Sequence, residues 1–144
     1  MSKLAFIFPG QGAQKAGMGK DFYENSEAAR SFFDQAQKIL DFDLKEMCFG
    51  EHEELNLTEY TQPCMVSVCL AIVQELKKRG INPDITAGLS LGEYAAVAAA
   101  GGMNELDAIK LVRRRGILMQ STVPAGEGAM AAVLGLDAKK IEEI

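Results

Sequence analysis

The segment Gly88-Leu89-Ser90-Leu91-Gly92 constrains the fold of this 144-residue chain more than any other. It follows a strand-like run, residues 84–88, and precedes an alanine-rich run, residues 95–100, that favours a helix. A Gly-x-Ser-x-Gly on a strand-to-helix turn is typical of a nucleophile elbow, whose flanking glycines avoid collisions with the neighbouring strand and helix. The sequence therefore predicts that Ser90 stands exposed at a helix N-terminus, where backbone N–H groups favour a developing oxyanion. The alternative is a turn whose serine only caps the helix.

A serine nucleophile needs a general base, which is usually a histidine. His52 is the single histidine of the sequence, and it lies in an acidic, loop-like stretch, residues 51–54. We expect it to be a solvated surface side chain, and no carboxylate is nominated as a base by its spacing. Either Ser90 is not catalytic, or its base lies outside these 144 residues.

Composition excludes several classes of protein. The length suits one domain with a proper core. With 15 basic and 20 acidic residues the net charge is −5, which argues against nucleic acid as the main partner. Three cysteines without a Cys-x-x-Cys pair, and one histidine, disfavour a disulfide framework or a metal site. The apolar run 4–9 is too short for a signal peptide or a membrane span, so the expected location is the cytoplasm.

Hydrophobic periodicity predicts an alternation of strands and helices. We expect strands at 4–8, 84–88 and 129–135, and helices at 22–40, at 61–79, from the elbow to Gly101, at 105–120 and from Asp137 onward. Pro63 suits the first turn of the second helix, and Asn104 suits the N-cap of the fourth. Residues 124–128 read as a linker. This order predicts the α/β class with a largely parallel sheet.

The glycine-rich loop Gly10-Gln11-Gly12 follows the first strand, at the sheet edge where open α/β folds bind their ligands. Lys15 breaks the dinucleotide fingerprint, and Asp21 breaks the phosphate-loop pattern. The loop is either a plain connection or a source of one oxyanion-hole donor, the backbone N–H of Gln11.

Arg115 falls in line with Ala108, Leu111 and Leu118, which we predict to be the buried stripe of the fourth helix. A buried guanidinium needs an anion, because an unpaired buried charge is very costly. Its partner is therefore either an internal carboxylate or a substrate carboxylate held by two hydrogen bonds. Arg113 is the weaker candidate for such a role.

Several segments together resemble the malonyl-CoA:acyl carrier protein transacylases and the acyltransferase domains of polyketide synthases. These segments are FPGQGAQ at 8–14, YTQP at 60–63, GLSLGEY at 88–94, Arg115-Gly116 and GAMAAV at 128–133. They follow the family's order and cover the chain from end to end. The resemblance implies an incomplete α/β-hydrolase-like core over residues 1–127 and the beginning of a small ferredoxin-like subdomain over residues 128–144.

The resemblance also implies the chemistry. Ser90 would attack malonyl-CoA to form an acyl-enzyme, and the phosphopantetheine thiol of acyl carrier protein would take the malonyl group, in fatty acid biosynthesis. The backbone N–H groups of Gln11 and Leu91 would bind the oxyanion and Arg115 the malonyl carboxylate, without metal or cofactor. Members of the family are about twice this long, and their catalytic histidine lies in the second half, so the chain alone is expected to be inactive. Leu89 stands where the family usually has a histidine that is not the base.

Two other functions stay open on the residues. One is a serine hydrolase or thioesterase, which uses water as the acceptor. The other is a non-enzymatic α/β interaction module with a vestigial elbow, which the missing base favours. Docking of an acidic carrier protein would need a basic patch, and the candidates are Lys77-Lys78-Arg79 and Lys110 with Arg114.

Overall fold

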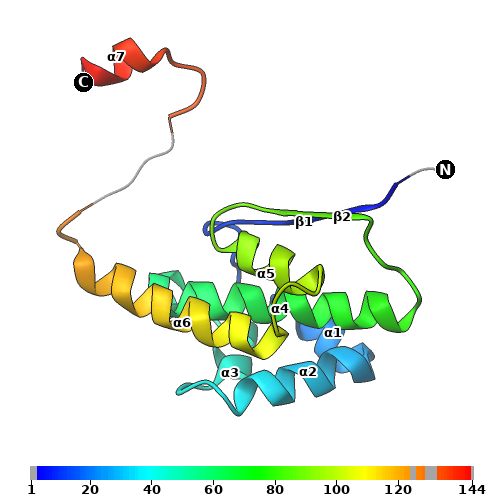
Figure 1. Cartoon of the computed structure of the whole chain (residues 1–144). Helices are drawn as coiled ribbons and strands as arrows, with labels where there is room; N and C mark the ends of the chain where they lie inside the picture. The colour runs from blue at the N-terminus through cyan, green and yellow to red at the C-terminus, as the bar shows by residue number, and fades with distance from the viewer. Residues whose placement is uncertain (1–2, 124–125, 129–132, 144) are drawn as a thin grey trace.

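The computed structural model describes residues 3–123, 126–128 and 133–143. These residues form mostly helices, together with one small sheet (Figure 1). The elements in chain order are β1 (Ala5–Phe8), α1 (Lys20–Asn25), α2 (Glu27–Gln37), α3 (Leu44–Phe49), the 3-10 turn η1 (Glu53–Asn56), α4 (Thr58–Lys78), β2 (Ile85–Gly88), α5 (Gly92–Ala99), α6 (Glu105–Thr122) and α7 (Ala138–Glu142). The predicted α/β class is confirmed, although the described residues hold a sheet of only two strands.

The two strands lie parallel, with Ala5 opposite Ile85 and Phe8 opposite Gly88. The pairing continues beyond β2, where the N–H of Leu89 donates to the carbonyl of Phe8 at 3.1 Å. Because parallel strands end at the same edge of a sheet, the loop after β1 and the turn after β2 meet there. This is the arrangement that the sequence predicted for the glycine-rich loop and the elbow.

Helix α4 is the central element of the fold, and α2, α5 and α6 pack around it (Figure 1). The apolar run 65–73 predicted deep burial, and most of α4 is indeed buried. The burial extends to two polar side chains near its N-terminus, Thr61 and Gln62, which are fully inaccessible. Buried polar groups require hydrogen-bond partners, so the start of α4 is held by specific contacts.

The single helix predicted over 22–40 is wrong, because the chain breaks it at Ser26 into α1 and α2. The hydroxyl of Ser26 accepts a hydrogen bond from the N–H of Ala29 at 3.1 Å and donates one to the Glu75 carboxylate on α4. Serine is a strong N-cap residue, and this side chain therefore starts a new helix. The periodic pattern missed the break because a capping serine can also occupy an apolar face.

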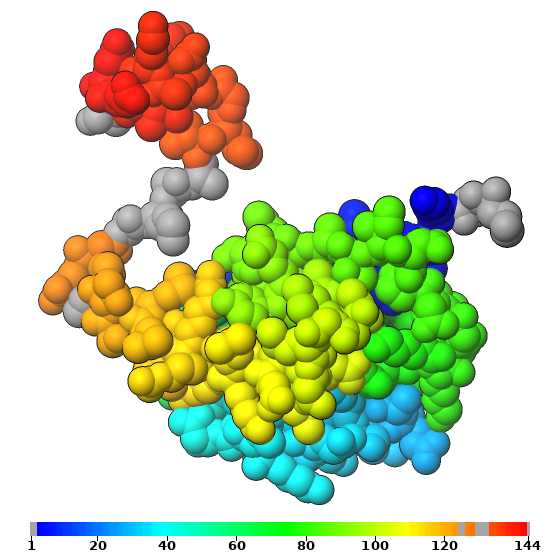
Figure 2. Space-filling model, viewed as in Figure 1, coloured from blue at the N-terminus to red at the C-terminus, as the bar shows by residue number. Residues whose placement is uncertain are grey.

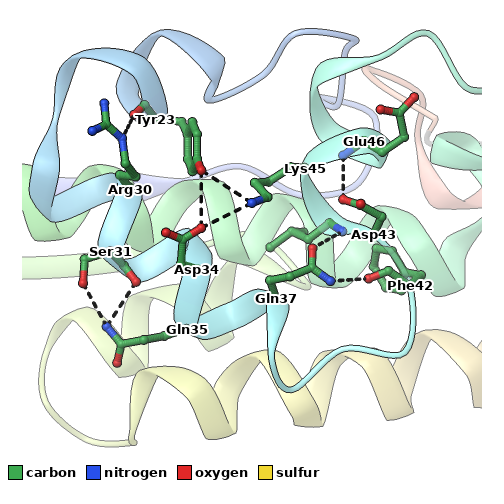
Figure 3. A network of polar contacts seen from close by, with 11 residues as sticks. Tyr23, Arg30, Ser31, Asp34, Gln35, Gln37, Phe42, Asp43, Lys45 and Glu46 are labelled. Atoms are coloured by element: carbon green, nitrogen blue, oxygen red, sulfur yellow. Dashed lines mark hydrogen bonds and ion pairs between the residues drawn. The ribbon is translucent and has the colours of Figure 1, made fainter.

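Helix α3 was absent from the prediction, and side chains fix the turn that leads into it (Figure 3). The Gln37 amide donates to the carbonyl of Phe42 at 2.9 Å and accepts from the N–H of Leu44 at 2.8 Å. Lys45, on α3, approaches the Asp34 carboxylate on α2 to 3.4 Å. These contacts link α2 and α3 across a turn that carries no strong sequence signal.

Helix α4 begins at Thr58, earlier than predicted, so Pro63 lies in its second turn and not in its first. A proline has no N–H, which leaves the carbonyl of Glu59, four residues earlier, without its helical partner. The guanidinium of Arg113 donates to that carbonyl at 2.8 Å. A contact from another helix therefore compensates for the proline, and sequence periodicity alone does not reveal it.

The C-terminal part confirms two predicted helix starts and corrects one predicted face. Asn104 caps α6 and Asp137 caps α7 through their side chains. The buried residues of α6 are Ala108, Ile109, Val112 and Gly116, whereas Leu111 and Leu118 are 45% and 50% exposed. The predicted stripe was thus wrong at its leucines.

The strand predicted at 129–135 falls mainly on residues 129–132, which lie outside the described residues, and Val133–Gly135 is not in a strand. In the view of Figure 2, α7 stands apart from the body formed by residues 3–123. Among the described helices, none is long and apolar enough to cross a membrane.

We expect Ser26→Ala to lower the free energy of unfolding by about 1–2 kcal/mol, since it removes the N-cap of α2. Hydrogen bonds from Ser26 and then Arg79 hold the pKa of Glu75 below its ordinary value of 4.5. A lowered carboxyl pKa stabilises the folded state above that ordinary value, and this contribution is lost as the pH falls through the folded pKa. The difference between wild type and variant should therefore be largest near neutral pH and shrink below about pH 4.5.

Urea unfolding at several pH values measures this difference. Ser31→Ala, on the exposed face of the same helix, is the matched control and should change stability little. An equal effect of the two substitutions would contradict the capping role of Ser26.

Candidate active site

The turn between β2 and α5 has the geometry of a nucleophile elbow. Ser90 has φ of 53°, the only positive φ outside glycine among the described residues, and its side chain is exposed. A Cβ on Gly88 would collide with the carbonyl of Gly92, and a Cβ on Gly92 would stand 2.5 Å from the carbonyl oxygen of Phe8. The predicted need for both glycines is confirmed, because the strand and the helix approach each other too closely for side chains.

The loop after β1 lies against this turn. A Cβ on Gly10 would be 3.1 Å from Leu89, and the Gln11 amide donates to the Thr58 hydroxyl at 3.1 Å, at the start of α4. Within residues 3–123, neither the N–H of Gln11 nor that of Leu91 donates to a protein acceptor. The structure thus places two unpaired backbone donors on the two segments that meet at the elbow.

Arg115 reaches the elbow from α6. Its Nη2 lies 3.2 Å from the Ser90 hydroxyl oxygen, and its Nη1 donates to the Gln62 amide oxygen at 2.7 Å. The guanidinium carbon is 5.8 Å from the ring centroid of Tyr94. No carboxylate of the described chain lies within ion-pair distance of Arg115. The structure therefore brings Arg115 and Ser90 together and leaves the charge of Arg115 uncompensated by the described residues.

Arg113, two residues earlier, is placed very differently. It donates two hydrogen bonds of 2.9 Å to the Asp41 carboxylate, pairs with Glu59 at 3.1 Å and lies within 5.2 Å of the ring centroids of Phe42 and Tyr60. Its hydrogen bond lowers the pKa of Asp41 below the ordinary range. Arg113 is thus a structural residue, saturated by acidic partners. The sequence signal that could have revealed this is the proline in α4, whose free carbonyl requires a donor.

His52 is not placed to serve Ser90. Its Nε2 lies 3.0 Å from the Glu46 carboxylate, and the side chain is 31% exposed, so His52 is less solvated than the sequence predicted. Among the described residues, the only side-chain hydrogen bond of Ser90 is the one with Arg115. Within the same residues, no group of three His, Cys, Asp or Glu side chains could hold a metal ion. The described site therefore holds a nucleophile, backbone donors and a cation, but no base.

The cysteines carry no chemistry of this site. Cys64 is fully buried as predicted, whereas Cys69 is half-buried on α4. Burial raises the pKa of the Cys69 thiol to about 11, and a hydrogen bond with Cys64 followed by burial raises that of Cys48. All of these shifts favour the protonated, unreactive thiol.

The predicted basic clusters are largely paired within the chain. Lys77, Lys78 and Arg79 form ion pairs with Glu105, Glu27 and Glu75, in that order. Lys110 pairs with Asp107 at 3.2 Å. Arg114 is exposed and makes no ion pair within the described residues. This pairing leaves the clusters with little net positive charge.

An elbow serine, adjacent backbone N–H donors and a cation are groups that acyl-transfer sites use, and the chain is similar in sequence to proteins of that class. Residues 5–143 match the model of the acyl transferase domain, so the chain belongs to this family. The chain is 50% identical over its whole length to the malonyl CoA-acyl carrier protein transacylase of Bacillus subtilis, of which it covers 46%.

Solved structures of malonyl transacylases are also similar to this chain. The malonyl CoA-acyl carrier protein transacylase of Clostridium perfringens is 43% identical, with a TM-score of 0.88 over 99% of this chain and 45% of that one. A malonyl-transacylase in complex with its type II polyketide acyl-carrier protein is 40% identical, with a TM-score of 0.88 over 99% of this chain and 47% of that one. The chain thus spans about half the length of the relatives it matches.

We expect Gly92→Ala to destabilise the protein by about 3 kcal/mol, because the added methyl overpacks the backbone at the end of β1. Thermal unfolding measures the loss. Gly102→Ala, just beyond the end of the same helix, is the control, since its added Cβ would meet mainly the tip of the Val97 side chain at 3.1 Å. A Gly92→Ala variant as stable as the control would contradict the close approach described above.

Proposed function

We propose that this chain is the N-terminal part of a malonyl-CoA:acyl carrier protein transacylase of fatty acid biosynthesis. The observation that carries the proposal is the contact between Arg115 and the elbow serine, in which Arg115 has no acidic partner among the described residues. Malonyl differs from most acyl groups by a carboxylate on the carbon next to the thioester carbonyl. A cation that recognises this carboxylate has to lie beside the nucleophile, and Arg115 lies there.

The proposed reaction has two steps. The Ser90 hydroxyl attacks the thioester carbonyl of malonyl-CoA, the oxyanion accepts hydrogen bonds from the N–H groups of Gln11 and Leu91, and the coenzyme A thiol leaves. The pantetheine thiol of acyl carrier protein then attacks the Ser90 ester and carries the malonyl group away. Arg115 binds the malonyl carboxylate with its remaining N–H groups throughout. A base from outside the described residues takes the serine proton and gives it to the leaving coenzyme A thiolate; in the second step it takes the pantetheine thiol proton and returns it to the Ser90 oxygen.

The proposal extends to the architecture and the cellular setting. Residues 1–127 would form part of an α/β-hydrolase-like core, and residues 128–144 would begin a ferredoxin-like subdomain. Acyl carrier protein is the proposed partner, as in the related complex, and the cytoplasm is the proposed location. In the two basic clusters named above, only Arg114 makes no ion pair within the described residues, so it is the cluster residue best suited to meet an acidic carrier.

Two competing functions predict different products. A hydrolase or thioesterase would release free malonate, and the uncompensated charge of Arg115 argues against it, since most hydrolase substrates lack a free carboxylate. A non-enzymatic interaction module would form no covalent adduct with malonyl-CoA. Incubating the full-length protein with labelled malonyl-CoA separates these cases. A stable ester on Ser90, discharged by acyl carrier protein, supports transfer, and either other outcome refutes it.

We expect Arg115→Ala to reduce kcat/KM for malonyl transfer about 30-fold or more, as for the loss of one partner of a desolvated charge pair. Acetyl transfer should change little, because acetyl has no charge to lose. Arg115→Lys should fall between, since lysine keeps the charge and loses the fork geometry. Steady-state kinetics with both acyl-CoA substrates checks this, and equal losses for the two would make Arg115 structural.

We further expect residues 1–144 alone to show negligible transacylase activity. Without a base the Ser90 hydroxyl stays protonated, and loss of a catalytic-triad member costs several orders of magnitude. Fusion of the chain to the remaining part of the Bacillus subtilis relative should restore transfer, with a histidine from that part beside Ser90. Robust malonyl transfer by the isolated chain would refute this and require a carboxylate or His52 as the base.

A further inference from the structure

Gln62 is a fully buried polar side chain on the second turn of α4, and it is directed at the candidate active site. Its amide oxygen accepts from Arg115 Nη1 at 2.7 Å, the shorter of the two side-chain hydrogen bonds of that guanidinium. Its amide nitrogen lies 3.3 Å from the sulfur of Met119 on α6. Gln62 thus contacts α6 on both sides of its amide group.

The surroundings determine which way the amide points. A guanidinium only donates hydrogen bonds, so the amide oxygen has to face Arg115. The NH2 group then faces the thioether of Met119, which is a weak acceptor. The reversed amide would set two donors against each other. The hydrogen-bond partners therefore determine the orientation of the Gln62 amide, and the flipped orientation is excluded.

Neutrality is the second property of this contact. An acidic side chain at position 62 would form an ion pair with Arg115 and compete with the carboxylate of a substrate. The amide holds one end of the guanidinium through a strong, charge-assisted hydrogen bond and leaves the positive charge available. Arg113 shows the opposite case in the same helix, since Asp41 and Glu59 neutralise it.

The segment of α4 that carries Gln62 is fixed by hydrogen bonds of its neighbours. The neighbouring Thr61 hydroxyl donates to the carbonyls of Leu55 and Leu57, at 2.6 and 3.0 Å, where the chain enters α4. The amide oxygen of Gln120, from α6, accepts from the N–H of Thr58 at 3.0 Å. The first two turns of α4 are therefore fixed to the helix that carries Arg115.

We propose that Gln62 is a positioning residue that holds the Arg115 guanidinium beside Ser90 with its charge uncompensated. It thereby sets the preference for acyl groups that carry a free carboxylate. The inference rests on the proposed transferase function. Gln62 touches neither Ser90 nor the reacting atoms in this arrangement, and it acts through Arg115.

The kinetic test uses residues 1–144 fused to the remaining part of the Bacillus subtilis relative. Gln62→Met keeps the volume and removes the acceptor, and Gln62→Glu keeps the shape and adds a charge. We expect Gln62→Met to raise KM for malonyl-CoA about tenfold, as for one lost hydrogen bond to a charged group, with kcat and acetyl transfer little changed. Gln62→Glu should lower the malonyl preference further, because the new carboxylate pairs with Arg115.

Gln74→Met is the matched control, since Gln74 lies on the same helix and its buried amide nitrogen has no hydrogen-bond partner among the described residues. It should leave both reactions unchanged. In an Arg115→Ala background, Gln62→Met should have no further effect on malonyl transfer, because the group it positions is gone. Equal losses for malonyl and acetyl, or an undiminished effect in the Arg115→Ala background, would overturn the proposal.

A second measurement does not depend on transfer activity. In nitrogen-detected NMR of the arginine side chains, the Arg115 guanidinium should rotate slowly in wild type and in Gln74→Met, and faster in Gln62→Met. Equal rotation in all three proteins would overturn the positioning role. If the wild-type fusion transfers no malonyl, the proposed function fails, and the NMR result still decides whether Gln62 holds Arg115.

Discussion

The rest of the structure depends on the close approach of the α5 N-terminus to the end of β1. Only the absence of side chains at Gly88 and Gly92 permits it, since a Cβ at either position would collide with backbone atoms. The approach requires Ser90 to adopt a left-handed backbone, at a cost of about 1–3 kcal/mol. Strand pairing and the burial of Leu91, which is 1% exposed, oppose that cost. The serine hydroxyl is thereby presented to solvent on a turn whose backbone cannot relax.

A second close approach places the cation. Where α6 crosses the start of α4, a Cβ on Gly116 would stand 2.8 Å from the Thr58 carbonyl oxygen and from Glu59 Cα. Residues of the YTQP segment, 60–63, contact α6 at this crossing. The Tyr60 ring and the carbonyl freed by Pro63 contact Arg113, and the Gln62 amide contacts Arg115. One short segment of α4 therefore positions two arginines of α6, which accounts for the burial of the Gln62 amide.

The sequence predicted well those features that depend on local chemistry. The elbow, with its two glycines, and the caps Asn104 and Asp137 follow from residue types at fixed spacing, and the structure has them. Features that depend on contacts between distant segments were missed. Ser26 splits a helix because Glu75 is available to it, and α4 starts early because Arg113 compensates for its proline. The predicted burial of Arg115 rested on a stripe whose two leucines are exposed, whereas its role at the site was implied by the family resemblance.

The contrast between Arg113 and Arg115 shows how one helix can serve both stability and chemistry. Residues two apart on an α-helix are separated by about 200° around its axis, so they meet different neighbours. Arg113 meets two carboxylates, which neutralise its charge, and two aromatic rings within cation–π distance. Within the part of the chain that the structure describes, Arg115 meets an amide, a hydroxyl and one ring, which orient the guanidinium but do not neutralise its charge. Replacing Gln62 by an acidic residue would complete that ion pair within the protein. The neutral amide leaves the charge of Arg115 for a carboxylate that arrives beside Ser90.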